Sequence, residues 1–128
     1  MSNSNIIKPT GAELKILQIL WEHGPSSVRF VNDKLNEEKE VGYTTTLKIM
    51  QIMSDKQLVN RNTDNRTHIY ESQIEEDATQ KQLLKKFVDA TFRGSAMKLV
   101  MQALGNHEAS EDDLQKIKDL IKKIESEK

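Results

Sequence analysis

The pattern of apolar and polar residues divides the chain into a mixed first part and a helical second part. Apolar residues recur every three or four positions over about 11–23, 27–36 and 42–56, which predicts three short helices. Residues 58–62 and 67–71 instead alternate around an Asp/Asn turn, which predicts a β-hairpin. We therefore expect three helices followed by two paired strands.

Local signals at the helix ends agree with this division. Thr10 and Glu13 have the spacing of a capping box, in which each side chain bonds to the backbone of the other residue. Gly24 supplies the turn that ends the first helix. Ser26 or Ser27 caps the second helix, since a serine hydroxyl accepts from a free N–H there.

Beyond Ser72 the periodicity is helical throughout, over about 75–92, 95–104 and 111–124. These segments are short and amphipathic and have no obvious way to close a core of their own, so we expect a second copy to complete it. The residues predicted to form this dimer contact are Leu84, Phe87, Val88, Phe92, Val100, Leu104, Leu114, Ile117 and Ile121.

The order of elements predicts a fold that is mainly α with a small β-hairpin wing. Residues 1–72 correspond to a winged helix-turn-helix domain, whose third helix usually lies in the major groove of DNA. Residues 73–128 correspond to a helical dimerisation domain.

The third predicted helix has one apolar and one polar side. Helical spacing turns Thr46, Ile49, Met50 and Met53 toward the core and leaves the polar side for a partner. By periodicity alone, an ordinary amphipathic helix with a solvated face is about as good an interpretation. The hairpin that follows this helix favours DNA. Taken by themselves, the cations of its turn are explained better as a charged, solvated turn, and the serines that open the second helix are explained equally well by capping. The predicted DNA-binding residues are Tyr43, Thr44, Thr45, Lys48, Gln51, Arg61, Arg66, Ser27 and Arg29.

Composition excludes several other functions. The 128 residues contain no cysteine, so disulfides, thiolate metal sites and cysteine catalysis are ruled out. The three histidines lie far apart, and no nucleophile–base set, metal-ligand spacing or phosphate loop occurs, so we expect no enzyme activity, metal or cofactor. No apolar run is long enough for membrane insertion, and the start lacks a signal peptide, which predicts a cytoplasmic protein.

Charge places a condition on the DNA hypothesis. The chain has a net charge of −1, whereas affinity for DNA comes largely from cations that meet phosphates. Only residues 41–70 are locally positive, with Lys48, Lys56, Arg61 and Arg66 against two aspartates. A few well-placed cations, doubled by dimerisation, would have to supply the affinity.

Four segments in this order resemble the penicillinase-repressor (BlaI/MecI-type) family of winged-helix transcriptional regulators. They are TGAELKILQILW at 10–21, GPSSVR at 24–29, GYTTT at 42–46 and LVNR at 58–61, and the resemblance covers roughly residues 8–124. It implies a repressor that binds a palindromic operator as a homodimer. It also implies that a membrane-bound sensor metalloprotease ends repression by prompting cleavage in the dimerisation domain.

The chain departs from the family pattern at several places, among them the wing turn, where Asn65-Arg66 stands in place of the usual Gly-Arg pair. Gln102-Ala103 occupies the region where the family commonly has a cleaved Asn-Phe bond. Many members have arginine where this chain has Ile52 and glycine where it has Gln57. The loss of a cation at Ile52, with the neutral charge of residues 1–72, leaves an alternative open: a winged-helix protein-interaction module without DNA binding.

Overall fold

The computed structural model describes residues 8–64, 66–106 and 111–126. They form two compact units whose division falls between Leu84 and Lys85. This division lies inside a helix, whereas the functional boundary predicted from the sequence, after Ser72, coincides with the end of the last strand.

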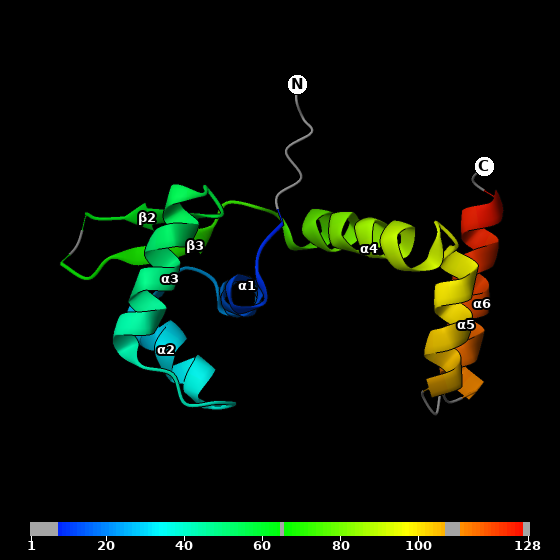
Figure 1. Cartoon of the computed structure of the whole chain (residues 1–128), viewed down its shortest axis with the longest axis horizontal. Coiled ribbons are helices and arrows are strands. Elements are labelled where there is room, and N and C mark those ends of the chain that lie inside the picture. The colour runs from blue at the N-terminus through cyan, green and yellow to red at the C-terminus, as the bar shows by residue number, and fades with distance from the viewer. Residues whose placement is uncertain (1–7, 65, 107–110, 127–128) are drawn as a thin grey trace, which may run out of the picture. The chain divides into compact units, whose positions relative to one another are not determined.

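The described residues confirm the predicted helices and hairpin and add a third strand (Figure 1). The added strand is only two residues long and lies just ahead of the second helix. Two residues are too few to show an alternating pattern, so the sequence does not predict this strand. The elements are α1 (Gly11–His23), β1 (Ser26–Ser27), α2 (Val28–Asn36), α3 (Tyr43–Asp55), β2 (Val59–Asn62), β3 (Ile69–Ser72), α4 (Glu76–Phe92), α5 (Ala96–Asn106) and α6 (Glu111–Ser126).

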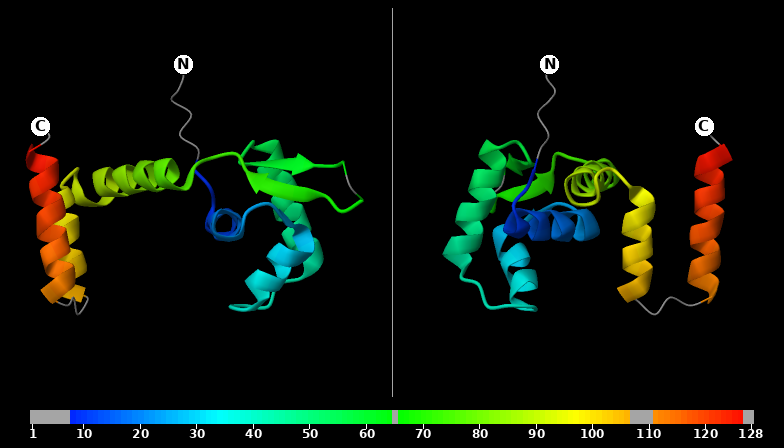
Figure 2. Two further views of the ribbon diagram at one scale, coloured as in Figure 1. Left: turned by 180° about the vertical axis from the view of Figure 1, so that it is seen from behind. Right: turned by 45° about the vertical axis from the view of Figure 1, so that its right-hand side comes forward.

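The strands form an antiparallel sheet in the order β1-β3-β2, so the expected two-stranded hairpin is in fact part of a three-stranded sheet. Tyr70 at the centre pairs with Ser26 on one side and with Arg61 on the other. The hairpin of β2 and β3 extends past α3 as a wing (Figures 1 and 2). The predicted turn residue Asn65 lies outside the described residues. Pairing with β1 ties the wing to the start of α2.

The predicted helix ends are present. The Thr10 hydroxyl accepts from the Glu13 N–H at 3.2 Å, and the Glu13 carboxylate accepts from the Thr10 N–H at 2.9 Å. Gly24 ends α1 with φ of 82°, in the left-handed region that glycine tolerates. Of the two candidate serines, Ser27 is the cap of α2, accepting from the Phe30 N–H at 3.1 Å. The sequence Ser110-Glu111-Asp112-Asp113 also predicts a cap for the last helix, but Ser110 lies outside the described residues.

One hydrophobic core joins the three helices of the first unit to its sheet. All of its fully buried members lie ahead of α4, and they come from each of the three helices and from β2 and β3. Ile49, expected in this core, is only partly buried and packs at its edge. The core members are Ile16, Leu17, Leu20, Val28, Val31, Met50, Met53, Leu58, Val59 and Tyr70.

A buried carboxylate links the start of α1 to the end of α3. Glu13 accepts from the Lys56 ammonium at 2.8 Å, and its side chain is 4% exposed, whereas that of Lys56 is 47% exposed. Burial raises the pKa of Glu13, but the hydrogen bonds from Lys56 and Thr10 outweigh burial and hold the pKa below its usual value of 4.5. The carboxylate therefore remains charged in the fold.

Trp21 packs at the edge of this core and has a second, polar role. It is half-buried, and its indole N–H donates to the Ser72 hydroxyl and to the Ile74 carbonyl, both at 3.0 Å. The Ser72 hydroxyl also donates to the Ile74 carbonyl at 2.6 Å. The indole thus fastens the segment between β3 and α4 to α1.

The helical part beyond β3 leaves much apolar surface exposed. Val88 is buried, while Leu84 and Phe87 on the same helix are about half exposed. α5 and α6 run in opposite directions (Figure 2), and Met97, Met101 and Leu120 on them are more than half exposed. The other predicted contact residues Phe92, Val100, Leu104, Leu114 and Ile117 are partly buried, and the side chain of Ile121 lies outside the described set. None of the helices within the described ranges combines the length and apolar character that a membrane span requires.

Candidate nucleic-acid interface

α3 presents three different sides to its surroundings. Thr46, Met50 and Met53 are buried in the core. Tyr43, Thr44, Thr45, Lys48 and Gln51 are exposed, as the helical pattern predicts. The exposed residues do not all face the same way, because Tyr43 and Gln51 line one hollow of the surface and Thr45 lines another.

The N-terminus of α3 is held by asparagine side chains of α2. The Asn32 amide donates to the Val41 carbonyl at 3.1 Å and to the buried Thr46 hydroxyl at 2.8 Å. The Asn36 amide donates to the same Val41 carbonyl at 3.0 Å, and its oxygen accepts from the Val41 N–H at 3.1 Å. α3 has no side-chain cap of its own at Gly42, so these bonds fix where the helix begins.

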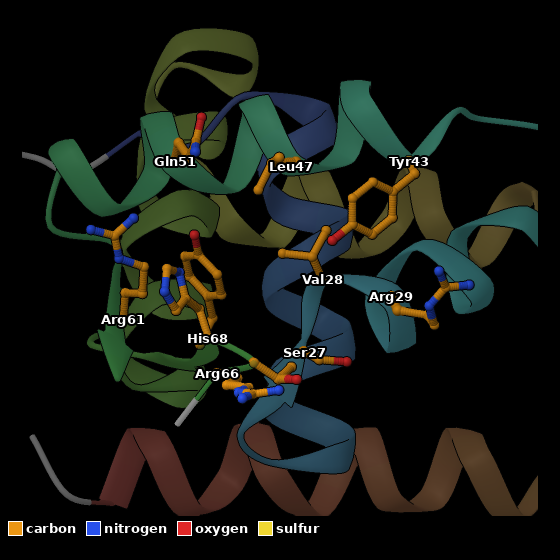
Figure 3. Close-up of a pocket in the computed structure, with 11 residues that line it drawn as sticks. Ser27, Val28, Arg29, Tyr43, Leu47, Gln51, Arg61, Arg66 and His68 are labelled. Carbon is orange, nitrogen blue, oxygen red and sulfur yellow. The ribbon is translucent and has the colours of Figure 1, made fainter. Parts of the chain in front are cut away.

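A hollow of about 620 Å³ lies between α3, the start of α2 and the wing (Figure 3). Arg29 lines it from α2, Arg61 from β2, and Arg66 and His68 from the segment leading into β3. No carboxylate is among the described residues that line it. Three guanidinium groups without an opposing acid make this hollow complementary to an anion, and guanidinium groups match phosphate geometry particularly well.

Several contacts shape the hollow before any partner arrives. The guanidinium carbon of Arg29 lies 5.8 Å from the centre of the Tyr43 ring, which is a cation–π distance and restrains the tyrosine at the start of α3. The Ser27 oxygen caps α2 by accepting from the Phe30 N–H, and its hydroxyl group can at the same time donate its proton to an anion. The hydroxyl of Tyr70, a fully buried residue lining the hollow, has no hydrogen-bond partner among the described residues.

The structure brings together six of the nine residues predicted to bind DNA. Thr44 and Lys48 are exposed on α3 outside the lining of the hollow, and Thr45 faces the other hollow. The six that line it are Ser27, Arg29, Tyr43, Gln51, Arg61 and Arg66.

Sequence reasoning missed five lining residues. Of these five, His68 could have been predicted, because it is a polar residue on a predicted strand beside a basic turn and is therefore exposed to the same partner. Two apolar residues, Val28 and Leu47, read as core members. Tyr70 also follows the apolar pattern of its strand, so nothing in the sequence marks its hydroxyl. The missed set is Val28, Leu47, Thr67, His68 and Tyr70.

Three helices, a wing and a cationic hollow between them define a winged helix-turn-helix transcriptional regulator. The chain belongs to the penicillinase repressor family, whose model matches residues 9–123. The methicillin resistance regulatory protein MecI of Staphylococcus aureus strain N315 is 20% identical over 114 residues, which cover 89% of this chain and 93% of MecI. The penicillinase repressor of Staphylococcus aureus is 22% identical over 113 residues, covering 88% and 90% of the two chains.

Solved structures share the fold. A complex structure of hsRosR-S4 superposes with a TM-score of 0.53 at 16% identity and covers 96% of this chain and 95% of that one. RosR of H. salinarum, in crystals grown from NaBr, gives a TM-score of 0.50 at 16% identity, with 97% and 100% covered. At this identity the likeness shows the fold alone.

Proposed function

We propose that this chain represses transcription by binding a palindromic operator as a homodimer, with α3 in the major groove and the wing against the backbone. The observation that carries the proposal is the hollow beside α3, lined by Arg29, Arg61 and Arg66 and by no described carboxylate. It reconciles a chain of net charge −1 with a polyanionic partner, because cations gather where the contact is made.

The remaining contacts divide by type. Arg61, Arg66 and the Ser27 hydroxyl suit phosphates, which fix the position of the protein without reading sequence. Tyr43 and Gln51 line the hollow from α3, and Thr44 and Lys48 are exposed beside them. These four side chains are suited to base edges and to the thymine methyl group.

A mobility-shift titration on the DNA upstream of the gene tests the interface. Arg66→Ala and Lys48→Ala should each weaken binding by about 1–3 kcal/mol or lower the salt slope by about one unit. Lys81→Ala, which removes an exposed cation from α4, is the matched control and should leave both unchanged. Equal affinity and slope for all three variants and the wild type would contradict the assignment.

The homodimer is supported by the apolar side chains that the helices beyond β3 leave exposed, including Leu84, Phe87 and Met101. Exposed apolar patches of this kind commonly mark an interface. A second copy is the natural occupant because operators and repressor dimers share two-fold symmetry. Light scattering should give twice the chain mass of 14.7 kDa.

Release by proteolysis, triggered by a membrane-bound sensor metalloprotease, is the mode of regulation that family membership suggests. Gln102 and Ala103 are exposed but lie within α5, and a helix must unfold locally before a protease can bind it in extended form. An intact chain after induction of the regulated gene would argue against cleavage here.

A protein-interaction module without DNA binding is the second candidate. It is favoured by Ile52, a 40% exposed apolar residue on α3 where many family members have arginine. The mobility-shift titration distinguishes the two functions, because a protein-interaction module would show no salt-dependent affinity for any upstream DNA fragment.

A further inference from the structure

A second hollow, of about 530 Å³, lies on the other side of α3 from the cationic one, and the two share no lining residue. Its apolar surface comes from α1, α2, the α2–α3 loop and α3, through Ile16, Leu35, Val41 and Ile49. All but Ile16 are only partly buried, so apolar surface remains open to a ligand. The volume lies in the range of about 300–1,000 Å³ that is typical of small-molecule sites.

The polar groups of this groove favour an anion. Lys15 and Lys39 line it, against one carboxylate, Glu40, and the Thr45 hydroxyl adds a donor. Lys15 reaches the Glu38 carboxylate only at 3.8 Å, and both side chains are more than half exposed. Such a surface ion pair is weak, so Lys15 is available to a ligand.

We propose that this groove binds a small organic anion with an apolar body, of the aromatic or aliphatic carboxylate class. The body lies against Leu35, Val41 and Ile49, and the carboxylate lies near the two lysines. The general pattern of ligand pockets is the same, an apolar lining with a few polar groups that fix orientation.

Such a ligand would act on the reading helix, and this part of the inference rests on the proposed function. Val41 lines the groove, and the Asn32 and Asn36 side chains hold its backbone carbonyl. Thr45 and Ile49 line it from α3 itself. A bound molecule therefore contacts both α3 and the loop at the start of α3. If it binds one placement of α3 more tightly than another, it changes the affinity for DNA by that difference.

The site is tested on the full-length chain by amide NMR titration with 1-naphthoate, octanoate and benzoate, and with neutral 1-naphthamide as the matched probe. At least one anion should give saturable shifts centred on Val41, Thr45 and Ile49, and 1-naphthamide should bind more weakly than 1-naphthoate. Lys15→Glu combined with Lys39→Glu should weaken binding at least about fivefold, since both charges are reversed next to the ligand. Lys118→Glu, the same change at an exposed position of α6, should leave it unchanged.

Three results would overturn the proposal: no saturable shift with any anion, shifts centred on α4 to α6, or equal affinity of the double variant and the Lys118→Glu control. Retained amide dispersion in each variant shows that it is folded, so that lost binding is not lost structure. The titration contains no DNA, and its outcome is therefore independent of whether the operator-binding proposal holds. Adding 1-naphthoate to the mobility-shift assay then tests the coupling to α3 separately.

Discussion

Replacing Lys56 by methionine should destabilise the winged-helix unit in a pH-dependent way. The variant keeps the aliphatic stem of Lys56 but removes the ammonium group that donates to Glu13. The Glu13 carboxylate, which is 4% exposed, then keeps the hydrogen bond from the Thr10 N–H at 2.9 Å. Breaking a fully buried ion pair costs about 3–5 kcal/mol. An exposed pair is worth about 0–1 kcal/mol. Because the Lys56 side chain is 47% exposed and water can take its place, we expect a loss of about 1–2 kcal/mol at pH 7.

The pH dependence follows from the lowered pKa of Glu13. A carboxyl group with a lower pKa in the folded than in the unfolded state contributes stability above the unfolded pKa, here about 4.5. That contribution disappears as the pH falls through the folded pKa, because the protonated carboxyl no longer attracts Lys56. The difference between wild type and Lys56→Met should therefore be full at pH 7 and shrink below about pH 4.5.

Urea unfolding followed by the fluorescence of the single tryptophan, Trp21, measures this difference. The chain concentration must be held constant, because dimerisation adds to apparent stability. Lys81→Met is the control: it breaks an exposed ion pair with Asp77, both side chains being 77% exposed, and should cost at most about 0.5 kcal/mol. Equal losses of stability in both variants, or a loss in Lys56→Met that is unchanged from pH 7 to pH 3, would contradict the role given to this ion pair.

Three further substitutions test other parts of the structure. Gln57 has φ of 66°, so Gln57→Gly should raise the free energy of unfolding by about 0.5–1 kcal/mol in urea, and a loss would show that no strain is relieved there. Trp21→Phe removes the indole N–H that is shared between the Ser72 hydroxyl and the Ile74 carbonyl and should cost about 1–2 kcal/mol by calorimetry, whereas an unchanged melting temperature would mean that this shared bond adds nothing. Ile117→Asp should shift the particle mass in light scattering toward one chain of 14.7 kDa, and an undisturbed dimer would exclude this face of α6 from the interface.

The parts of the fold that sequence predicts are those determined by neighbouring residues. The Thr10–Glu13 capping box, the glycine turn at Gly24 and the hairpin are local, and each is present. The strand β1 is absent from the prediction because two residues cannot show a period; its pairing with β3 comes from tertiary contact. The ion pair of Glu13 with Lys56 joins residues 43 positions apart and has no signature in the sequence.

For the candidate site, the sequence predicts which residues are exposed better than it predicts where they point. Tyr43 and Thr45 are both exposed on α3, yet they line hollows on different sides of it. Which hollow each of them lines depends on how the buried side of α3, with Thr46, Met50 and Met53, packs in the core, and the Asn32 bond to Thr46 ties α3 to α2. Conversely, Arg61 and Arg66 line the same hollow as Arg29 because the sheet places the wing beside the start of α2.

Gln57 stands where the family resemblance leads us to expect glycine, and its backbone gives that expectation a physical reason. Gln57 follows the end of α3 and adopts the left-handed conformation, which costs a residue with a side chain roughly 1–2 kcal/mol. Its N–H donates to the Ser54 carbonyl at 3.0 Å, as in a helix-ending turn. The chain therefore keeps the turn that ends α3, with a strained backbone at Gln57.

Footprinting of the wild-type chain on the DNA upstream of its gene tests the central claim most directly. A homodimer that places one α3 in the major groove of each half-site should protect two symmetry-related stretches, separated by about one helical turn or a multiple of it. Arg61→Ala combined with Arg66→Ala should remove this protection at the same protein concentration. Absence of any protected stretch, or protection by the double variant equal to that of the wild type, would contradict the account.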